Sequence, residues 1–141
     1  MGTDVSGGFA PSILTEIRHA SIASKVRPMM DAIANKPISS STFTSARGLS
    51  VATLLYLATL GGASLCNLEN DIGSFAPGKQ FDALYVSLRE GGNPAVWFEE
   101  DKDESLEQQL ERFLFGGDNR NIRKVWVSGR LVGGVDLDAS G

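Results

Sequence analysis

The 141-residue sequence has little of the two residue types that build most metal and redox sites, with one cysteine and one histidine. The single cysteine, Cys66, cannot form an internal disulfide, which favours a reducing, cytoplasmic compartment. The single histidine, His19, excludes a His-x-His or His-Glu-x-x-His zinc motif within these residues. We expect His19 to have a structural or surface role and Cys66 to be a small buried side chain.

The sequence also lacks a basic region and a long apolar run. The net charge is −4, and the acidic run at 99–104 carries five acids and one lysine, so the rest of the chain is close to neutral. No basic stripe remains to bind nucleic acid. No segment reaches the ~18 apolar residues of a membrane span. Apolar residues make up 42% and charged residues 21% of the chain, which is typical of a folded globular protein.

Helical patterns dominate the first half of the chain. The spacing of Ile13, Ile17 and Ala20 predicts a helix that begins near Pro11 and ends near Val26, because Pro28 follows. A second short helix is expected at 29–34, followed by a long loop at 35–48. Ser50 is a favourable N-cap for a buried helix at 51–60, which Gly61-Gly62 should break or kink before another helical turn or two at 63–68.

The second half of the sequence has the patterns of a small sheet with one helix. The run 81–86 is typical of a strand, and 95–98 is a weaker candidate. An amphipathic helix is predicted from about Asp103 to Phe115, ended by Gly116-Gly117. Residues 124–132, with Ser128-Gly129 at the centre, predict a β-hairpin.

Two loops carry candidate chemistry. Residues 73–80, Gly-Ser-Phe-Ala-Pro-Gly-Lys-Gln, nearly match a phosphate-binding P-loop, but Gln80 replaces the magnesium-binding hydroxyl and a strand follows where a helix is needed. We therefore predict that Gly78-Lys79 is a turn into the strand and that Asp82 serves this structural element. Near the beginning of the sequence, Asp4 lies among glycines at 2, 7 and 8, and an aspartate in such a loop usually caps a turn.

Five segments together resemble the C-terminal part of guanine deaminases of the amidohydrolase superfamily. They are Gly-Thr-Asp-Val-Ser-Gly-Gly at 2–8 with Pro-Ser-Ile-Leu at 11–14, Leu-Ala-Thr-Leu-Gly-Gly-Ala at 57–63, Ile-Gly-Ser-Phe at 72–75, Gly-Lys-Gln-Phe-Asp-Ala at 78–83, and Phe-Leu-Phe-Gly-Gly-Asp-Asn-Arg-Asn-Ile at 113–122 leading into Val-Trp-Val at 125–127. The last segment is the one most particular to guanine deaminases.

This resemblance implies an α/β fold, with residues 1–70 at the C-terminal end of a (β/α)8 barrel and residues 71–141 in a composite β-sandwich. It implies that Asp4 is the aspartate of the metal site, where it ligates Zn²⁺ and accepts a proton from the zinc-bound water. The implied reaction is the hydrolysis of guanine to xanthine and ammonia in purine catabolism. The resemblance also implies a homodimer, with guanine as the small-molecule partner and with neither nucleic acid nor a membrane as a partner.

The implied zinc site needs a His-x-His pair, two further histidines and a glutamate, and one histidine cannot provide them. We therefore expect the chain to be a C-terminal fragment that is incomplete and inactive in isolation, with the apolar face of the 51–60 helix and the edges of its strands exposed. Two alternatives stay open. The chain is a fragment of a related amidohydrolase that acts on another heterocycle, or it is a short non-catalytic product that binds or regulates the full-length enzyme.

Overall fold

The computed structural model describes residues 1–35, 48–89, 92–96 and 104–136. The chain divides into two compact units, Met1–Ala58 and Thr59–Gly141, here called unit 1 and unit 2. The predicted loop at 35–48 and most of the acidic run lie outside the described residues. None of the described helices is long and apolar enough to cross a membrane.

Unit 1 contains two helices, α1 (Ile13–Asn35) and α3 (Val51–Ala58), which contact one another. The prediction that the first helix ends near Val26 was wrong, because α1 continues through Pro28 to Asn35 and absorbs the predicted second helix. A proline within a helix removes one backbone donor and crowds the carbonyl four residues earlier, but it does not always end the helix. The residues after it include methionine and alanine, which favour helix strongly enough to continue α1.

The predicted cap of α3 is confirmed. The Ser50 hydroxyl accepts a hydrogen bond from the backbone N–H of Thr53 at 3.1 Å, which satisfies one of the free donors at the beginning of the helix. The expectation that this helix is buried holds only for Leu54, which is fully buried, whereas Leu55 and Tyr56 are exposed.

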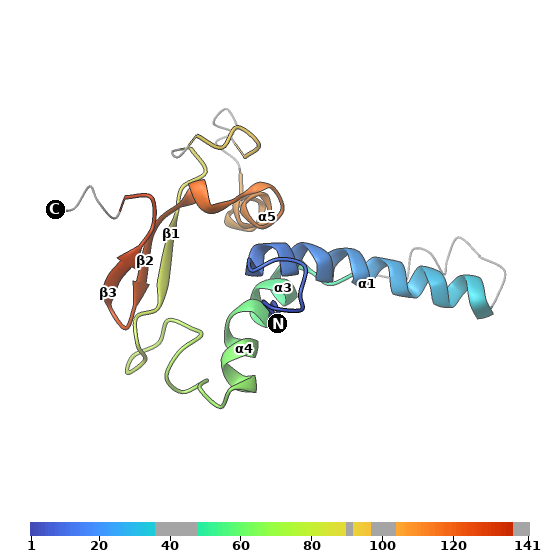
Figure 1. Ribbon diagram of the computed structural model, residues 1–141, viewed down its shortest axis with the longest axis horizontal. Coiled ribbons are helices and arrows are strands. Elements are labelled where there is room, and N and C mark those ends of the chain that lie inside the picture. Colours follow the sequence, from blue (N-terminus) through green and yellow to red (C-terminus); the bar gives the residue numbers. More distant parts are fainter. Residues whose placement is uncertain (36–47, 90–91, 97–103, 137–141) are drawn as a thin grey trace. The chain divides into compact units, whose positions relative to one another are not determined.

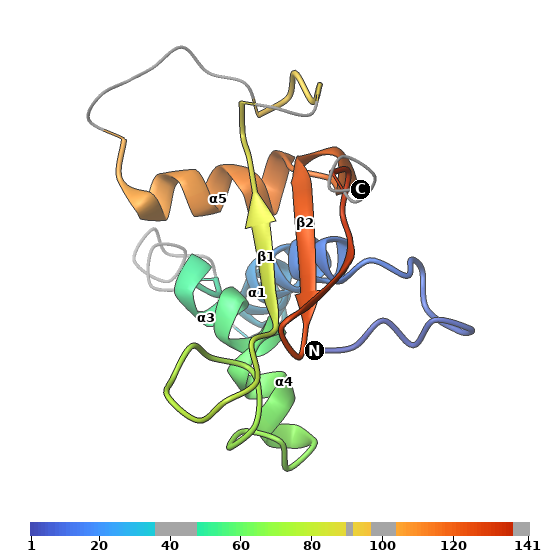
Figure 2. The same ribbon diagram turned by 90° about the vertical axis from the view of Figure 1, so that its left-hand side faces the viewer.

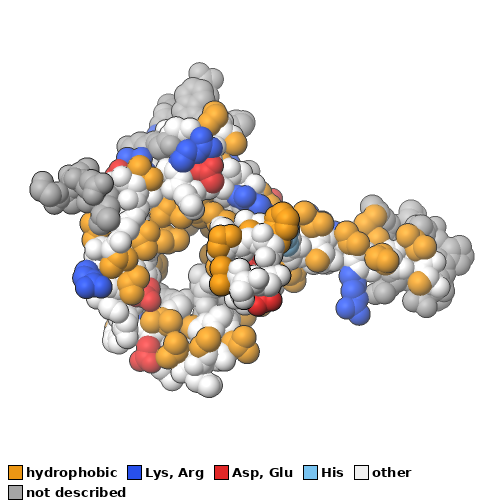
Figure 3. Space-filling view, in the orientation of Figure 1, with side chains coloured by type: hydrophobic (Ala, Val, Ile, Leu, Met, Phe, Trp, Pro, Cys, Tyr) orange, Lys and Arg blue, Asp and Glu red, His pale blue; other side chains and the backbone are white. Residues whose placement is uncertain are grey.

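Apolar side chains are exposed along the second half of α1, where orange side chains are visible in Figure 3. Ile22, Val26, Met30 and Ile33 follow one another at spacings of four, four and three residues, so they lie on one face of the helix. The exposed fractions of Ile22, Met30 and Ile33 exceed 60%. Near the middle of the helix, the Leu49 N–H donates to the Ser24 hydroxyl and joins α1 to the residues that precede α3.

Unit 2 begins with the short helix α4 (Leu60–Leu65), followed by a long loop and a three-stranded antiparallel sheet (Figures 1 and 2). The glycines at 61 and 62 lie inside α4, so the predicted break there was wrong. The helical path is interrupted at Thr59, whose φ of −123° and ψ of −102° lie outside helical geometry.

The sheet has the order β1-β2-β3 and confirms the predicted hairpin. β1 (Ala83–Val86) pairs with β2 (Ile122–Val127), and β2 pairs with β3 (Arg130–Gly133). Ser128 and Gly129 connect the hairpin with φ values of 50° and 77°. Two consecutive positive φ angles are typical of the type I′ turn, whose twist matches that of paired strands.

The predicted amphipathic helix is α5 (Leu106–Gly116), and it ends at the glycine pair as expected. Ser105 and Gln108 form a capping box at its beginning, since each side chain bonds the other residue's backbone N–H. Its buried side chains are Phe113 and Leu114. The weaker strand candidate was wrong for Ala95 and Val96, which lie in a turn, while 97–98 fall outside the described residues.

Candidate functional site

Asp4 lies at the beginning of a tight turn in the loop formed by residues 1–10, here called the Asp4 loop. The Asp4 carbonyl accepts hydrogen bonds from the backbone N–H groups of Gly7, at 2.8 Å, and of Gly8. The φ of Asp4 is 46°, which is in the left-handed region that non-glycine residues rarely adopt. Aspartate is among the residues that tolerate this conformation, and backbone strain of this kind gathers at functional sites.

The close packing of the turn requires glycine at position 8 and leaves little space beside Gly7. A Cβ at Gly8 would lie 1.8 Å from the Thr3 carbonyl oxygen, which no side chain can accommodate. A Cβ at Gly7 would lie 3.0 Å from Oδ2 of Asp4, so any side chain there would press against the carboxylate. The glycines therefore leave room for the Asp4 carboxylate, which is exposed to solvent.

Both ends of the Asp4 loop are attached to the helices of unit 1. The nitrogen of Met1 donates to the Leu57 carbonyl of α3 at 3.2 Å. At the other end, the Phe9 ring meets the His19 ring of α1 edge to face, with ring centroids 5.2 Å apart and planes inclined by 65°. Asp4 is thus held between two anchors, although the residues around it are mostly glycine and small polar side chains.

The described residues do not complete a metal site around Asp4. Within 1–35, 48–89, 92–96 and 104–136, no three His, Cys, Asp or Glu side chains gather closely enough to hold an ion. A structural or catalytic zinc needs at least three protein ligands. Asp4 is therefore suited to be one ligand of a metal site, but the described residues do not hold a catalytic metal by themselves.

Neither His19 nor Cys66 belongs to a cluster of three metal-ligating side chains among the described residues. His19 has its Nδ1 atom 3.8 Å from Oε1 of Glu16, one turn earlier on α1, and its side chain is 44% exposed. His19 is therefore partly exposed on α1, and the structural or surface role expected for it stays a prediction. The expectation that Cys66 is buried was wrong. Cys66 is exposed at the C-terminal end of α4, where the helix stops.

The glycine-rich segment at 73–80 is a structural turn, as predicted. Gly78 has a φ of +88°, and the Lys79 N–H closes the turn on the Ala76 carbonyl at 3.2 Å. The Lys79 ammonium donates to the carbonyl of Glu69 and, at 2.8 Å, to the Ser74 hydroxyl. Its positive charge is directed to the loop's own oxygen atoms, whereas a P-loop lysine would be directed to a phosphate.

Asp82 stabilises the sheet through the hairpin turn. Its Oδ1 atom accepts a hydrogen bond from the Ser128 N–H at 2.7 Å, across 46 residues of sequence. The adjacent Gly129 N–H donates to the Phe81 carbonyl at 2.9 Å. The carboxylate therefore holds the first of the two left-handed residues of the β-turn, which supports the structural role predicted for Asp82.

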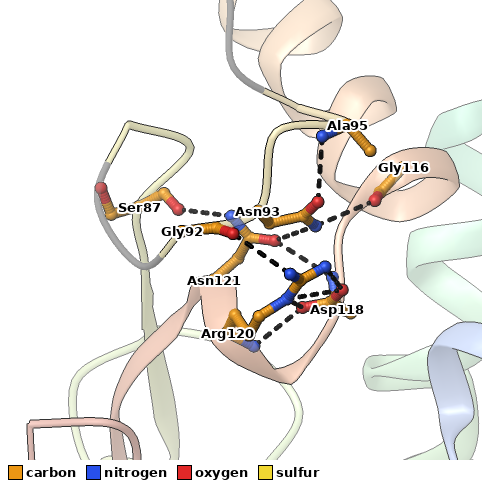
Figure 4. A network of polar contacts seen from close by, with 8 residues as sticks. All are labelled: Ser87, Gly92, Asn93, Ala95, Gly116, Asp118, Arg120 and Asn121. Atoms are coloured by element: carbon orange, nitrogen blue, oxygen red, sulfur yellow. Dashed lines mark hydrogen bonds and ion pairs between the residues drawn. The ribbon is translucent and has the colours of Figure 1, made fainter.

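The segment at 113–122, on which the family resemblance most depends, contains a buried asparagine at the centre of a polar network (Figure 4). Asn121 is fully buried. Its Oδ1 accepts hydrogen bonds from the Asn93 amide at 2.9 Å and from the Asp118 N–H at 3.1 Å, while its Nδ2 donates to the Ser87 carbonyl at 2.9 Å. One side chain thus joins three segments: the end of β1, the 92–96 turn and the short 3-10 helix η1 (Asn119–Asn121).

Two further side chains extend this network. Asn93 also donates to the Gly116 carbonyl at 3.2 Å, which fixes the C-terminal end of α5. Arg120 forms an ion pair with Asp118 and donates to the Gly92 carbonyl at 3.1 Å. The hydrogen bonds to Asp118 raise the pKa of Arg120 above its ordinary value.

Neither Asn93 nor Asn121 was predicted from the sequence to have a role in this network. The spacing of Asp118 and Asn121 is that of a capping box, in which each side chain bonds a backbone N–H at the beginning of the helix. That spacing was the available signal for η1. No signal in the sequence pairs Asn121 with Asn93, because 28 residues separate them.

The chain is similar to known proteins along nearly its whole length. Residues 1–132 match the model of the amidohydrolase family. A probable guanine deaminase of Schizosaccharomyces pombe is 40% identical over 99% of this chain and 24% of its own length. Guanine deaminase of Mus musculus is 36% identical over 94% of this chain and 27% of its own length.

Solved structures give the same result. An Escherichia coli guanine deaminase structure aligns with a TM-score of 0.72 and 29% identity, covering 95% of this chain and 27% of its own. A guanine deaminase structure from Bradyrhizobium japonicum aligns with a TM-score of 0.73 at 23% identity, which supports the fold alone. The chain spans about a quarter of the length of these relatives.

Proposed function

The chain belongs to the amidohydrolase family, and from this membership we propose that it is the C-terminal part of a guanine deaminase, which hydrolyses guanine to xanthine and ammonia. The observation that carries the proposal is the similarity to guanine deaminases along 94–99% of the chain. The aligned region includes the Asp4 loop as well as the Asn121 network, which lie in different units. Purine catabolism in the cytoplasm is the corresponding cellular role.

We propose that residues 1–70 form the end of the family's (β/α)8 barrel and that residues 71–141 form part of a composite β-sandwich. Two observations support this division. The exposed apolar stripe on α1 is the kind of surface that a barrel would cover. The described three-stranded sheet has open edges at β1 and β3, which are suited to pairing with strands from another part of the enzyme.

In this proposal, Asp4 supplies one ligand of a zinc site. Its carboxylate is exposed, and Gly7 and Gly8 keep the space beside it free of side chains. Zinc bound with histidines from elsewhere in the enzyme would supply hydroxide near neutral pH. Asp4 can accept the proton of the attacking water at one carboxylate oxygen, which is the task of a general base. The remaining ligands and the groups that hold the guanine ring must come from outside this chain.

A chimeric enzyme tests the proposal. Residues 1–141 would replace the matching C-terminal quarter of the Schizosaccharomyces pombe relative, and ammonia release would be measured with guanine, adenine and cytosine. We expect release from guanine alone. Release from another base with none from guanine would assign the chain to a different amidohydrolase. If a folded, zinc-loaded chimera releases ammonia from none of the bases, the proposal fails.

The isolated 141-residue chain provides the second half of the test. We expect no ammonia release above background with added zinc and much less than one zinc per chain, because a single carboxylate ligand cannot hold a catalytic metal. Measurable turnover by the purified chain would contradict the requirement for ligands from elsewhere.

A further inference from the structure

At the far end of the Asp4 loop, the Phe9 side chain contacts the His19 ring of α1. Phe9 is 85% exposed, so burial gives its side chain little stabilisation. Its ring nevertheless meets the His19 ring in the edge-to-face geometry that aromatic pairs favour, at 5.2 Å. Between Phe9 and α1, which begins at Ile13, the chain has only three residues.

His19 is well suited to act as the fixed partner in this contact. It lies in the second turn of α1, where the backbone is held by the helix. Its Nδ1 atom faces Oε1 of Glu16 at 3.8 Å, and that oxygen is buried without a hydrogen-bond partner among the described residues. At this distance there is no hydrogen bond, so the position of the ring follows from the helix backbone.

We propose that His19 is a positioning residue for Asp4: its ring holds Phe9 and so fixes the C-terminal end of the Asp4 loop. Met1 and Leu57 hold the other end. With both ends fixed, the turn closed by Gly7 keeps the Asp4 carboxylate in one place. The catalytic consequence rests on the proposed function, whereas the ordering of the loop does not.

Hydrogen–deuterium exchange on the folded chimera described above tests the ordering directly. The probe is the peptide at 2–10, which includes the Gly7 and Gly8 amides that bond to Asp4. Replacing His19→Leu should speed its exchange by about 2- to 12-fold, the range that follows from the free energy of an aromatic pair. His19→Phe keeps a ring and should stay within about twofold of the parent, by the same pair energy. Ala23→Leu, one turn further along α1, is the matched control and should leave the rate unchanged.

Three exchange results would overturn the proposal: equal rates for His19→Leu and the parent, equal rates for His19→Phe and His19→Leu, or a parent peptide that exchanges as fast as in urea. The chimera described above provides the functional readout. There, His19→Leu should lower kcat and leave the KM for guanine unchanged, with His19→Phe restoring kcat. A rise in KM at constant kcat would contradict positioning. If the parent chimera deaminates no guanine, the proposed function fails, and the exchange result still decides the role of His19.

Discussion

The replacement Asn121→Ala tests whether the segment shared with guanine deaminases is primarily structural. The Asn121 side chain takes part in three hydrogen bonds, with Asn93, Asp118 and Ser87, and is fully buried. Each such bond contributes a net ~0.5–1.5 kcal/mol, and alanine leaves its buried partners unpaired. We therefore expect the replacement to destabilise this part of unit 2 by about 2–4 kcal/mol, which is large for a single mutation.

Amide exchange measures this loss locally. The Ser87 N–H donates to the Asn121 carbonyl at 2.9 Å, next to the β1–β2 pairing, so its opening reports on the network. A loss of about 2–4 kcal/mol corresponds to exchange roughly 30- to 900-fold faster, if opening is in equilibrium. Asn119→Ala, two residues earlier and exposed, is the matched control, and surface replacements of this kind usually stay within about 0.5 kcal/mol.

The reasoning would be refuted if Asn121→Ala and Asn119→Ala gave the same exchange at Ser87. It would also be refuted if Asn121→Ala left the chimera fully stable while guanine turnover was lost, because that result would identify Asn121 as a residue of the reaction. The structural interpretation requires the opposite order, in which stability falls first and activity follows the folded fraction.

Three further predictions concern the two loops and the isolated chain. In the chimera, Asp4→Asn should fold but lose about 10²–10⁴-fold in kcat, which is the usual contribution of a general base. The control replacement Ser6→Ala should have a much milder effect. Near-native turnover by Asp4→Asn would show that Asp4 takes no part in the reaction. Asp82→Asn weakens the hydrogen bond to the Ser128 N–H and should lower the free energy of unfolding in urea by about 1 kcal/mol, with turnover per folded enzyme unchanged. A roughly thousandfold loss of turnover in folded, metal-loaded enzyme would contradict the structural role of Asp82. Heating the isolated chain should give no sharp monomeric transition by calorimetry, because apolar side chains of α1 and the edges of the sheet stay exposed.

Local sequence patterns predicted the elements whose stability is itself local. The hairpin was predictable because Ser128-Gly129 can adopt the two positive φ angles that a tight turn needs. The cap at Ser50 and the end of α5 at its glycine pair follow from groups within one or two turns of the helix. The same kind of local reasoning placed Asp4 in a turn and excluded a P-loop at 73–80.

The sequence by itself also determined the family, because five ordered segments match the pattern of guanine deaminases and the comparisons confirm the match. Tertiary structure decided the rest. Whether α1 continues past Pro28 depends on the balance between one lost hydrogen bond and the turns that follow. The links from Asn121 to Asn93, from Asp82 to Ser128 and from Phe9 to His19 join residues 10 to 46 positions apart, and a sequence pattern cannot specify such contacts because chain folding alone brings them together.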